Sequence, residues 1–234
     1  MIVERCRLSR CATWRRREAV PTLLQYAIDN DGEIDEVGDE GKTLLLLAAE
    51  VGDGETVQVL VAAGANVDKP DRNGSTPLMA AAESGFASAV ALLIAANAQV
   101  DAVNRYSQTA VYLAVAKGHT AIVAALIAAG ADVNKSGPFA SALAIAALNG
   151  RADLVRLLID ADARRDEALW GAAVGGNVRV VTLLLSAGVS REALTAAVHR
   201  ALPQCDSSAA VALLIMAGAD IDACADWSLS AEMA

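Results

Sequence analysis

The chain has 234 residues, is 55 % hydrophobic but only 3 % aromatic, and carries a formal net charge of −9. This acidic balance argues against general nucleic-acid binding, which requires a basic face. No apolar run reaches the roughly 18 residues that span a bilayer, so we predict no membrane span. Many small aliphatic residues and few aromatic rings favour helices packed at short distance over a β-sandwich or a deep cofactor pocket.

The first 20 residues form a basic arm. They hold six arginines and two glutamates, a charge of +4, which leaves −13 on the other 214 residues. The arm could bind an acidic partner, a membrane surface or a transport receptor. We favour a solvated first helix that pairs with the acidic stretch at residues 29–40. Residues 8–17 and 23–28 are predicted as the helices of this region.

Two sets of turn residues recur along the rest of the chain. The first set is spaced at intervals of 33, 33, 32 and 26 residues and comprises Gly52, Gly85, Gly118, Gly150 and Gly176. The second set stays in phase with the first and comprises Gly64, Asn97, Gly130, Asp162, Gly188 and Gly218. Glycine, and after it asparagine, tolerates the positive φ with which helices commonly end. Two independent markers in phase therefore predict a repeated pair of helices.

Residues 71–101 show how one repeat is expected to fold. Thr76 is placed to cap a helix, and Pro77 follows at the first helical position, where its missing N–H costs nothing. Residues 78–84 then form one helix, and residues 86–96 form a second with an apolar face. Neither short helix can bury its apolar face alone, so the unit has to be repeated.

This segment resembles one complete ankyrin repeat. The resemblance rests on Gly74, Thr76-Pro77-Leu78, Ala81-Ala82, Gly85, Val90, Leu92-Leu93-Ile94 and Val100-Asp101. Thirty-three residues is also the period of ankyrin repeats. The resemblance implies an all-α fold: an ankyrin-repeat solenoid of stacked antiparallel helix pairs with short β-hairpin loops, the fingers, which project between repeats.

We divide the chain into a basic N-terminal arm with a degenerate capping repeat (1–37), the ankyrin repeats (38–222), and a C-terminal tail or truncated next repeat (223–234). The six repeats span 38–68, 71–101, 104–134, 135–163, 166–190 and 191–222. The last two repeats have no room for a finger before their first helix, and the connection within the sixth is long. We therefore expect the partner surface to lie in the first four repeats.

One family feature is missing. Ankyrin repeats commonly place a histidine after the Thr-Pro-Leu, where it ties neighbouring repeats by hydrogen bonds. Here the matching positions hold Leu46, Met79, Tyr112, Ala144 and Trp170. We predict that all five are buried, that Trp170 fills space in the compact fifth repeat, and that apolar packing holds the repeats together, at roughly 1.5–3 kcal/mol for each large buried side chain.

The sequence offers no catalytic, cofactor-binding or metal site. It contains no P-loop, GxSxG, HExxH or EF-hand loop. Its two histidines are far apart, and His119 is expected to bond to its local backbone. No CxxC pair occurs among the four cysteines, which we interpret as isolated thiols in a reducing compartment, the cytoplasm or else the nucleus; they are Cys6, Cys11, Cys205 and Cys224.

What the resemblance implies about function is protein–protein binding by a monomeric, non-catalytic scaffold or adaptor, on its concave hairpin and first-helix face. The alternative is a substrate-recruiting or targeting module of a larger enzyme or receptor. The candidate partner-binding residues are Arg72, Asn73, Ser75, Glu83, Arg105, Tyr106, Gln108, Lys117 and Phe139, and the variable positions of the first repeat add Asp39, Glu40, Lys42, Glu50 and Val51. Arg72, Arg105 and Tyr106 come first, because Arg and Tyr are favoured at binding hot spots. Leu126, Asp132 and Asn134 also resemble the spacing of ankyrin asparaginyl-hydroxylation sites.

Overall fold

The computed structural model describes residues 34–38, 40–135, 140–201 and 208–219. The predicted arm, the capping repeat up to residue 33, the C-terminal tail, all four cysteines, Asp39 and Phe139 lie outside these residues. Contacts between Cα atoms divide the chain into two compact units, residues 1–132 and 133–234.

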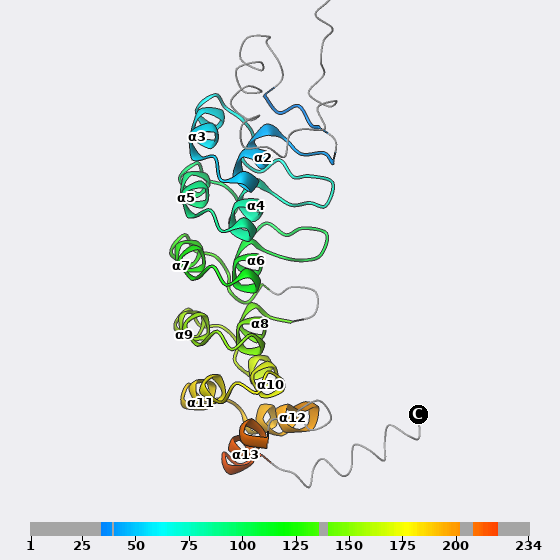
Figure 1. Ribbon diagram of the computed structural model, residues 1–234, viewed down its shortest axis with the longest axis vertical. Helices are drawn as coiled ribbons and strands as arrows, with labels where there is room; N and C mark the ends of the chain where they lie inside the picture. The colour runs from blue at the N-terminus through cyan, green and yellow to red at the C-terminus, as the bar shows by residue number, and fades with distance from the viewer. Residues whose placement is uncertain (1–33, 39, 136–139, 202–207, 220–234) are drawn as a thin grey trace, which may run out of the picture. The chain divides into compact units, whose positions relative to one another are not determined.

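The first unit consists, in its described part, of three helix pairs: α2 (Leu44–Val51) with α3 (Gly54–Ala62), α4 (Pro77–Ser84) with α5 (Ala87–Ala95), and α6 (Ala110–Lys117) with α7 (Thr120–Ala128). The first helices of each pair, α2, α4 and α6, pack on one another in a row, and α3, α5 and α7 form a second row beside them (Figure 1). The loops before α4 and α6 project away from the second row. These loops are the predicted fingers.

The second unit repeats this arrangement with α8 (Ala142–Leu148) and α9 (Ala152–Asp160), α10 (Asp166–Val174) and α11 (Val178–Ser186), and α12 (Arg191–Ala201) and α13 (Ser208–Met216). Only five residues separate α9 from α10, and four separate α11 from α12. The prediction that the last two pairs lack fingers is therefore confirmed.

Helix starts and ends follow the expected chemistry. The side chains of Thr43, Thr76, Thr109 and Ser141 each accept a hydrogen bond from the backbone N–H three residues later. Both sets of turn residues have positive φ, from +59° at Asn97 and Asp162 to +101° at Gly218. The repeated helix pair and the all-α class predicted from these markers are confirmed.

The fingers differ from the expected β-hairpins, because no described residue is assigned to a β-strand. In one finger the N–H of Asp71 donates to the carbonyl of Ser75 and that of Gly74 donates to Asp71. Each finger also bonds to the one before it, since the N–H of Arg105 donates to Asn73 at 2.8 Å. The fingers are hydrogen-bonded turns that support one another.

The prediction that apolar packing alone joins the repeats is wrong, because a ladder of polar contacts also joins them. In the first unit, the carboxylates of Asp35, Asp68 and Asp101 accept the backbone N–H groups of Asn66, Gln99 and Asp132 at 2.8–3.0 Å. In the second unit, Asn134 accepts from Arg164 and Asp166 accepts from Ser190. We call these five contacts the ladder.

His119 also links neighbouring pairs instead of bonding to its local backbone. Its Nε2 lies 3.1 Å from the carbonyl oxygen of Glu83, 36 residues earlier. Asn177 plays a similar part in the second unit, where its side-chain amide donates to the carbonyls of Ala147 and Leu148. Polar side chains placed just after the first helix of a pair thus replace the missing histidines.

Four of the five residues at the missing-histidine positions are buried as predicted: Leu46, Met79, Tyr112 and Ala144. Trp170 is only half-buried, so the prediction is wrong there. The indole Nε1 is buried, and beside Trp170 a Cβ on Gly171 would come within 2.6 Å of the backbone carbonyl of Ala144, so α10 packs directly on α8. The guanidinium of Arg200 lies 6.0 Å from the centre of the Trp170 ring.

Candidate protein-binding face

The fingers of the first unit hold their tips in fixed positions. Asp71 Oδ1 accepts the N–H groups of Asn73 and Ser75, both at 2.8 Å. Asn104, which is buried, does the same for Tyr106 and Gln108 at 2.9 and 3.0 Å. These turns are typical of Asp and Asn, whose short side chains mimic a backbone turn. The ordering of the finger backbone is therefore established before any partner arrives.

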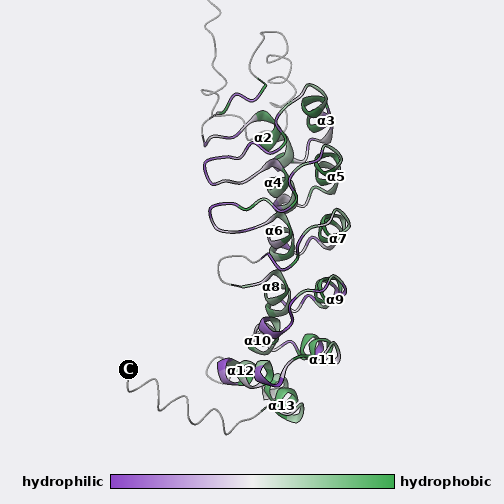
Figure 2. Ribbon diagram, turned by 180° about the vertical axis from the view of Figure 1, so that it is seen from behind, coloured by the Kyte–Doolittle hydropathy of each residue, from purple (hydrophilic) through white to green (hydrophobic). Residues whose placement is uncertain are grey.

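The fingers consist largely of hydrophilic residues (Figure 2). Arg72, Asn73, Arg105 and Tyr106 are all exposed, and 57 % of the Tyr106 surface is accessible. An exposed aromatic ring on a rigid loop keeps its binding area available at little entropic cost.

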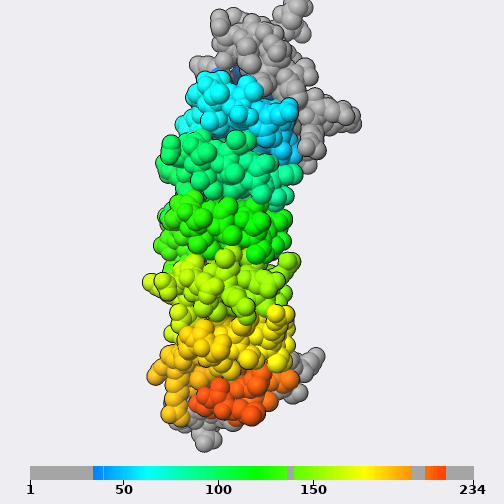
Figure 3. Space-filling model, turned by 90° about the vertical axis from the view of Figure 1, so that its left-hand side faces the viewer, coloured from blue at the N-terminus to red at the C-terminus, as the bar shows by residue number. Residues whose placement is uncertain are grey.

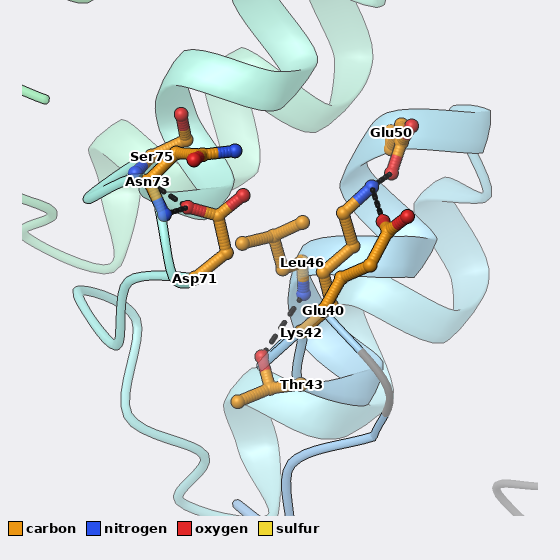
Figure 4. A network of polar contacts seen from close by, with 8 residues as sticks. All are labelled: Glu40, Lys42, Thr43, Leu46, Glu50, Asp71, Asn73 and Ser75. Carbon is orange, nitrogen blue, oxygen red and sulfur yellow. Dashed lines mark hydrogen bonds and ion pairs between the residues drawn. The ribbon is translucent and has the colours of Figure 1, made fainter. Parts of the chain in front are cut away.

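A groove of about 470 Å³ lies between the finger that precedes α4 and the first helices of the three pairs. Its floor contains Leu46, Met79 and Leu113, one side chain from each of α2, α4 and α6. One wall is the finger with Asp71, Asn73 and Ser75 (Figure 4). Towards the C-terminal ends of the helices it is lined by Glu50, Glu83, Ser84 and Lys117.

Two lysines form three ion pairs in and beside the groove. Lys42 Nζ lies 2.8 Å from Glu50 and 3.2 Å from Glu40, between the two carboxylates (Figure 4). Burial by itself lowers the pKa of Lys42, but hydrogen bonds and charges from Glu50 and Glu40 outweigh it, so the pKa is raised above the usual 10.5. Lys117 Nζ lies 3.3 Å from Glu83, with both side chains about half exposed.

The structure brings most of the predicted residues to this one face. Asn73, Ser75, Glu83 and Lys117 line the groove. Arg72, Arg105 and Tyr106 stand at the finger tips, whereas Gln108 is half-buried and its side chain accepts a hydrogen bond from Asn104 within its own finger. The face includes Lys42 and Glu50 from the variable positions of the first repeat.

Sequence reasoning missed Asp71 as a groove residue, because its place in the turn motif accounts for it fully. A geometric argument could have identified Asp71. The backbone contacts of this turn use only one carboxylate oxygen, Oδ1, so the second oxygen is not needed for the turn.

A second exposed surface of the first unit is formed by the outer helices α3, α5 and α7 (Figure 3). Neither α5 nor α7 contains a charged residue, and their exposed positions include Ala91, Ala95, Ala124 and Ala128. Such small side chains offer few directional contacts. The finger and groove face is the better candidate, since it combines an aromatic ring, arginines and polar groups.

The described residues contain no group of three or more His, Cys, Asp or Glu residues arranged to hold a metal ion. None of the helices in this part of the chain has the length and apolar character needed to cross a membrane.

Comparison with known proteins agrees with the helix pairs. The family model described as ankyrin repeats (3 copies) matches residues 8–104, 45–137 and 143–224. The crystal structure of the human ASB11 ankyrin repeat domain is similar, with a TM-score of 0.68, 25 % sequence identity, and coverage of 77 % of this chain and 86 % of that chain. No curated protein matches the sequence. Because the family model matches most of the chain and the same caps, turns and helix pairs recur along it, this chain belongs to the ankyrin repeat family.

Proposed function

We propose that this chain is a non-catalytic scaffold that binds another protein through the fingers and groove of its first unit. Ankyrin repeats are generally protein–protein interaction modules. The observation that carries the proposal is the finger backbone: its hydrogen bonds are satisfied internally, while Arg72, Arg105 and Tyr106 remain exposed at its tips. Preordered loops with exposed hot-spot residue types bind with a small entropic cost.

The remaining assignments follow the same reasoning and are part of the proposal. The chain acts as a monomer and binds another protein. It does not bind nucleic acid, because its charge outside the arm is strongly negative. We place it in the cytoplasm on the strength of its scattered cysteines. Its division into 1–37, 38–222 and 223–234 stays a prediction from the sequence.

The test is capture of partners from an extract of the source cells. The intact chain is compared with a variant carrying Arg72→Ala, Arg105→Ala and Tyr106→Ala. A matched control carries Arg156→Ala, Arg179→Ala and Val178→Ala, which removes two arginines and one large side chain from exposed positions of α9 and α11. Circular dichroism must show the same helical content for all three proteins.

We call the variant with Arg72→Ala, Arg105→Ala and Tyr106→Ala the finger variant. We expect the intact chain and the control to capture at least one protein whose captured amount falls more than about tenfold with the finger variant. Equal capture by all three proteins would place the binding site away from the finger tips. Failure of the intact chain to capture any protein would count against a scaffold role.

A further inference from the structure

The groove of the first unit carries an excess of negative charge. Three carboxylates line it, those of Glu50, Asp71 and Glu83. Two ammonium groups, those of Lys42 and Lys117, oppose them, so the formal charge of the groove is −1. A partner that presents positive charge here complements the groove.

Asp71 is the carboxylate best placed to receive that charge. Its Oδ1 holds the finger turn, and no described cation lies within ion-pair distance of it. The other oxygen points away from the turn, on the side of Leu46 (Figure 4). A guanidinium or ammonium group can therefore reach this oxygen without breaking any contact of the finger.

The three existing ion pairs leave the groove open to a further cation. The Glu40, Glu50, Glu83 and Lys117 side chains are between 42 % and 63 % exposed, and exposed pairs contribute only about 0.2–1 kcal/mol. Glu50 and Glu83 each use one carboxylate oxygen for these pairs. A second cation can share their carboxylates at little cost.

The floor of the groove offers a small apolar surface to the stem of a basic side chain. Leu46 and Met79 line it, but each is only 1 % exposed. Arginine and lysine lay their aliphatic stems along apolar surface while the charged head stays near polar groups. A glutamate or aspartate in the same place would meet Asp71 and Glu50 with like charge.

We propose that the partner of this face is an extended peptide segment that inserts an arginine or lysine into the groove, with its charged head against Asp71. This rests on the proposed function and specifies the chemistry of the partner. The finger-tip residues Arg72, Arg105 and Tyr106 contact the flanking parts of the segment.

The experiment selects random linear peptides by phage display on the immobilised full chain. One enriched peptide is then synthesised with its basic residue as arginine and as citrulline, which keeps the shape and removes the charge. Affinities are measured for the intact chain, for Asp71→Asn and for Glu55→Gln. Asparagine keeps the Oδ1 acceptor of the turn, and Glu55 provides the same charge change on the exposed side of α3.

We expect enriched peptides to contain more arginine and lysine than the unselected library. Asp71→Asn should lower the affinity for the arginine peptide about tenfold, and Glu55→Gln should change this affinity less than about twofold. The citrulline peptide should bind both the intact chain and Asp71→Asn weakly and alike, because the two changes remove the same contact. Glu83→Gln, whose side chain holds no backbone group, gives a second measurement if Asp71→Asn lowers the melting temperature.

The other outcomes separate the two proposals. If the finger variant loses the peptides but citrulline substitution and Asp71→Asn change nothing, the basic insertion is overturned and the binding face stands. If peptides bind the finger variant and the intact chain equally, the binding face itself is overturned. If no peptide is enriched on the intact chain, both are overturned.

Discussion

Gly85 and Gly64 have nearly the same backbone conformation but different surroundings. Their φ angles are +88° and +87°. A Cβ on Gly85 would lie 2.6 Å from Cε1 of His119, whereas a Cβ on Gly64 would meet no atom within 4 Å. Gly85 thus serves both the turn and the contact with the next helix pair, and Gly64 serves only the turn.

The pair gives a prediction with its own control. Gly64→Ala should lower the free energy of unfolding by about 1–2 kcal/mol, the cost of a side chain in the left-handed region. Gly85→Ala should lower it by about 1–3 kcal/mol more, because the added carbon collides with His119. Urea unfolding followed by circular dichroism measures both. Equal losses would mean that the His119 contact adapts freely.

Lys42 supplies a pH-dependent contribution to stability. Its pKa is raised in the folded chain, because Glu50 and Glu40 outweigh the opposing effect of burial. A raised pKa means that the stabilisation is complete below the unfolded value of 10.5 and is lost as the pH rises through the folded value.

Lys42→Met keeps the packing of the stem and removes the charge. We expect this variant to be less stable than the intact chain by about 0.2–1 kcal/mol at neutral pH. The difference should vanish above the folded pKa of Lys42. Comparing the two proteins at each pH cancels the titration of every other group, and a difference that does not change with pH would contradict the ion-pair assignment.

Among the contacts between helix pairs, the ladder was the hardest to predict from the sequence. Four of its five acceptors are the Asp or Asn residues that close a repeat, and its donors are backbone groups that no side-chain pattern reveals. Asn134 shows that an amide oxygen can take the place of a carboxylate, since it accepts the Arg164 N–H at 2.8 Å. This contact predicts that the hydrogen-bond acceptor matters more than its charge.

Asp68 tests this directly, because its Oδ1 accepts the Gln99 N–H at 2.8 Å. Asp68→Ala should lower the free energy of unfolding by about 1 kcal/mol. Asp68→Asn should lose less than half as much, and the amide of Gln99 should exchange faster with solvent in the alanine variant alone. An asparagine variant as unstable as the alanine variant would show that charge is the main term.

The helix pairs themselves could be predicted, because their limits depend on local chemistry. Thr76, Pro77 and Asn97 act within a few residues of their own position, so the chain around them is sufficient to place α4 and α5. The partial exposure of Trp170 could not be predicted, because the local sequence does not show how closely α10 packs on α8, where Gly171 approaches the Ala144 carbonyl. A Gly171-Ala-Ala-Val-Gly175 motif in a short helix was the available signal for that close approach.

The candidate site could likewise be predicted only in part. Exposed positions such as Arg72 and Tyr106 follow from the repeat register. The groove does not, because it depends on how three helices and one finger lie in space. Lys42 precedes α2, whereas Glu50 lies near the end of that helix. The sequence therefore does not show that their side chains form an ion pair.

Across the whole molecule, charge is distributed unevenly. Residues 1–20 carry +4 and the other 214 carry −13. The long-range field that a partner meets is produced by all 28 acidic residues together, whereas the contact at Asp71 involves one of them. The electrostatic steering of a partner should therefore respond to salt, whereas the contact at Asp71 should respond to substitution of that residue.

For the arginine peptide, the association rate constant should fall as salt rises from well below to physiological ionic strength, because salt screens the field. Asp71→Asn should leave this salt dependence nearly unchanged and should instead raise the dissociation rate constant. Surface plasmon resonance measures both rates. A variant that alters only association would show that Asp71 acts at long range and not by contact.

Each rung of the ladder joins an acceptor on one helix pair to a donor on the next, and in the first unit the rungs all span 31 residues. A connection of this head-to-tail kind does not close on itself, so each added copy presents the same unfilled edge as the last. Duplicating residues 69–101 in frame would add one rung and require no new type of contact. Length is thus a free variable in this architecture. A chain built this way can enlarge the area it offers to a partner by whole copies while every local rule stays the same.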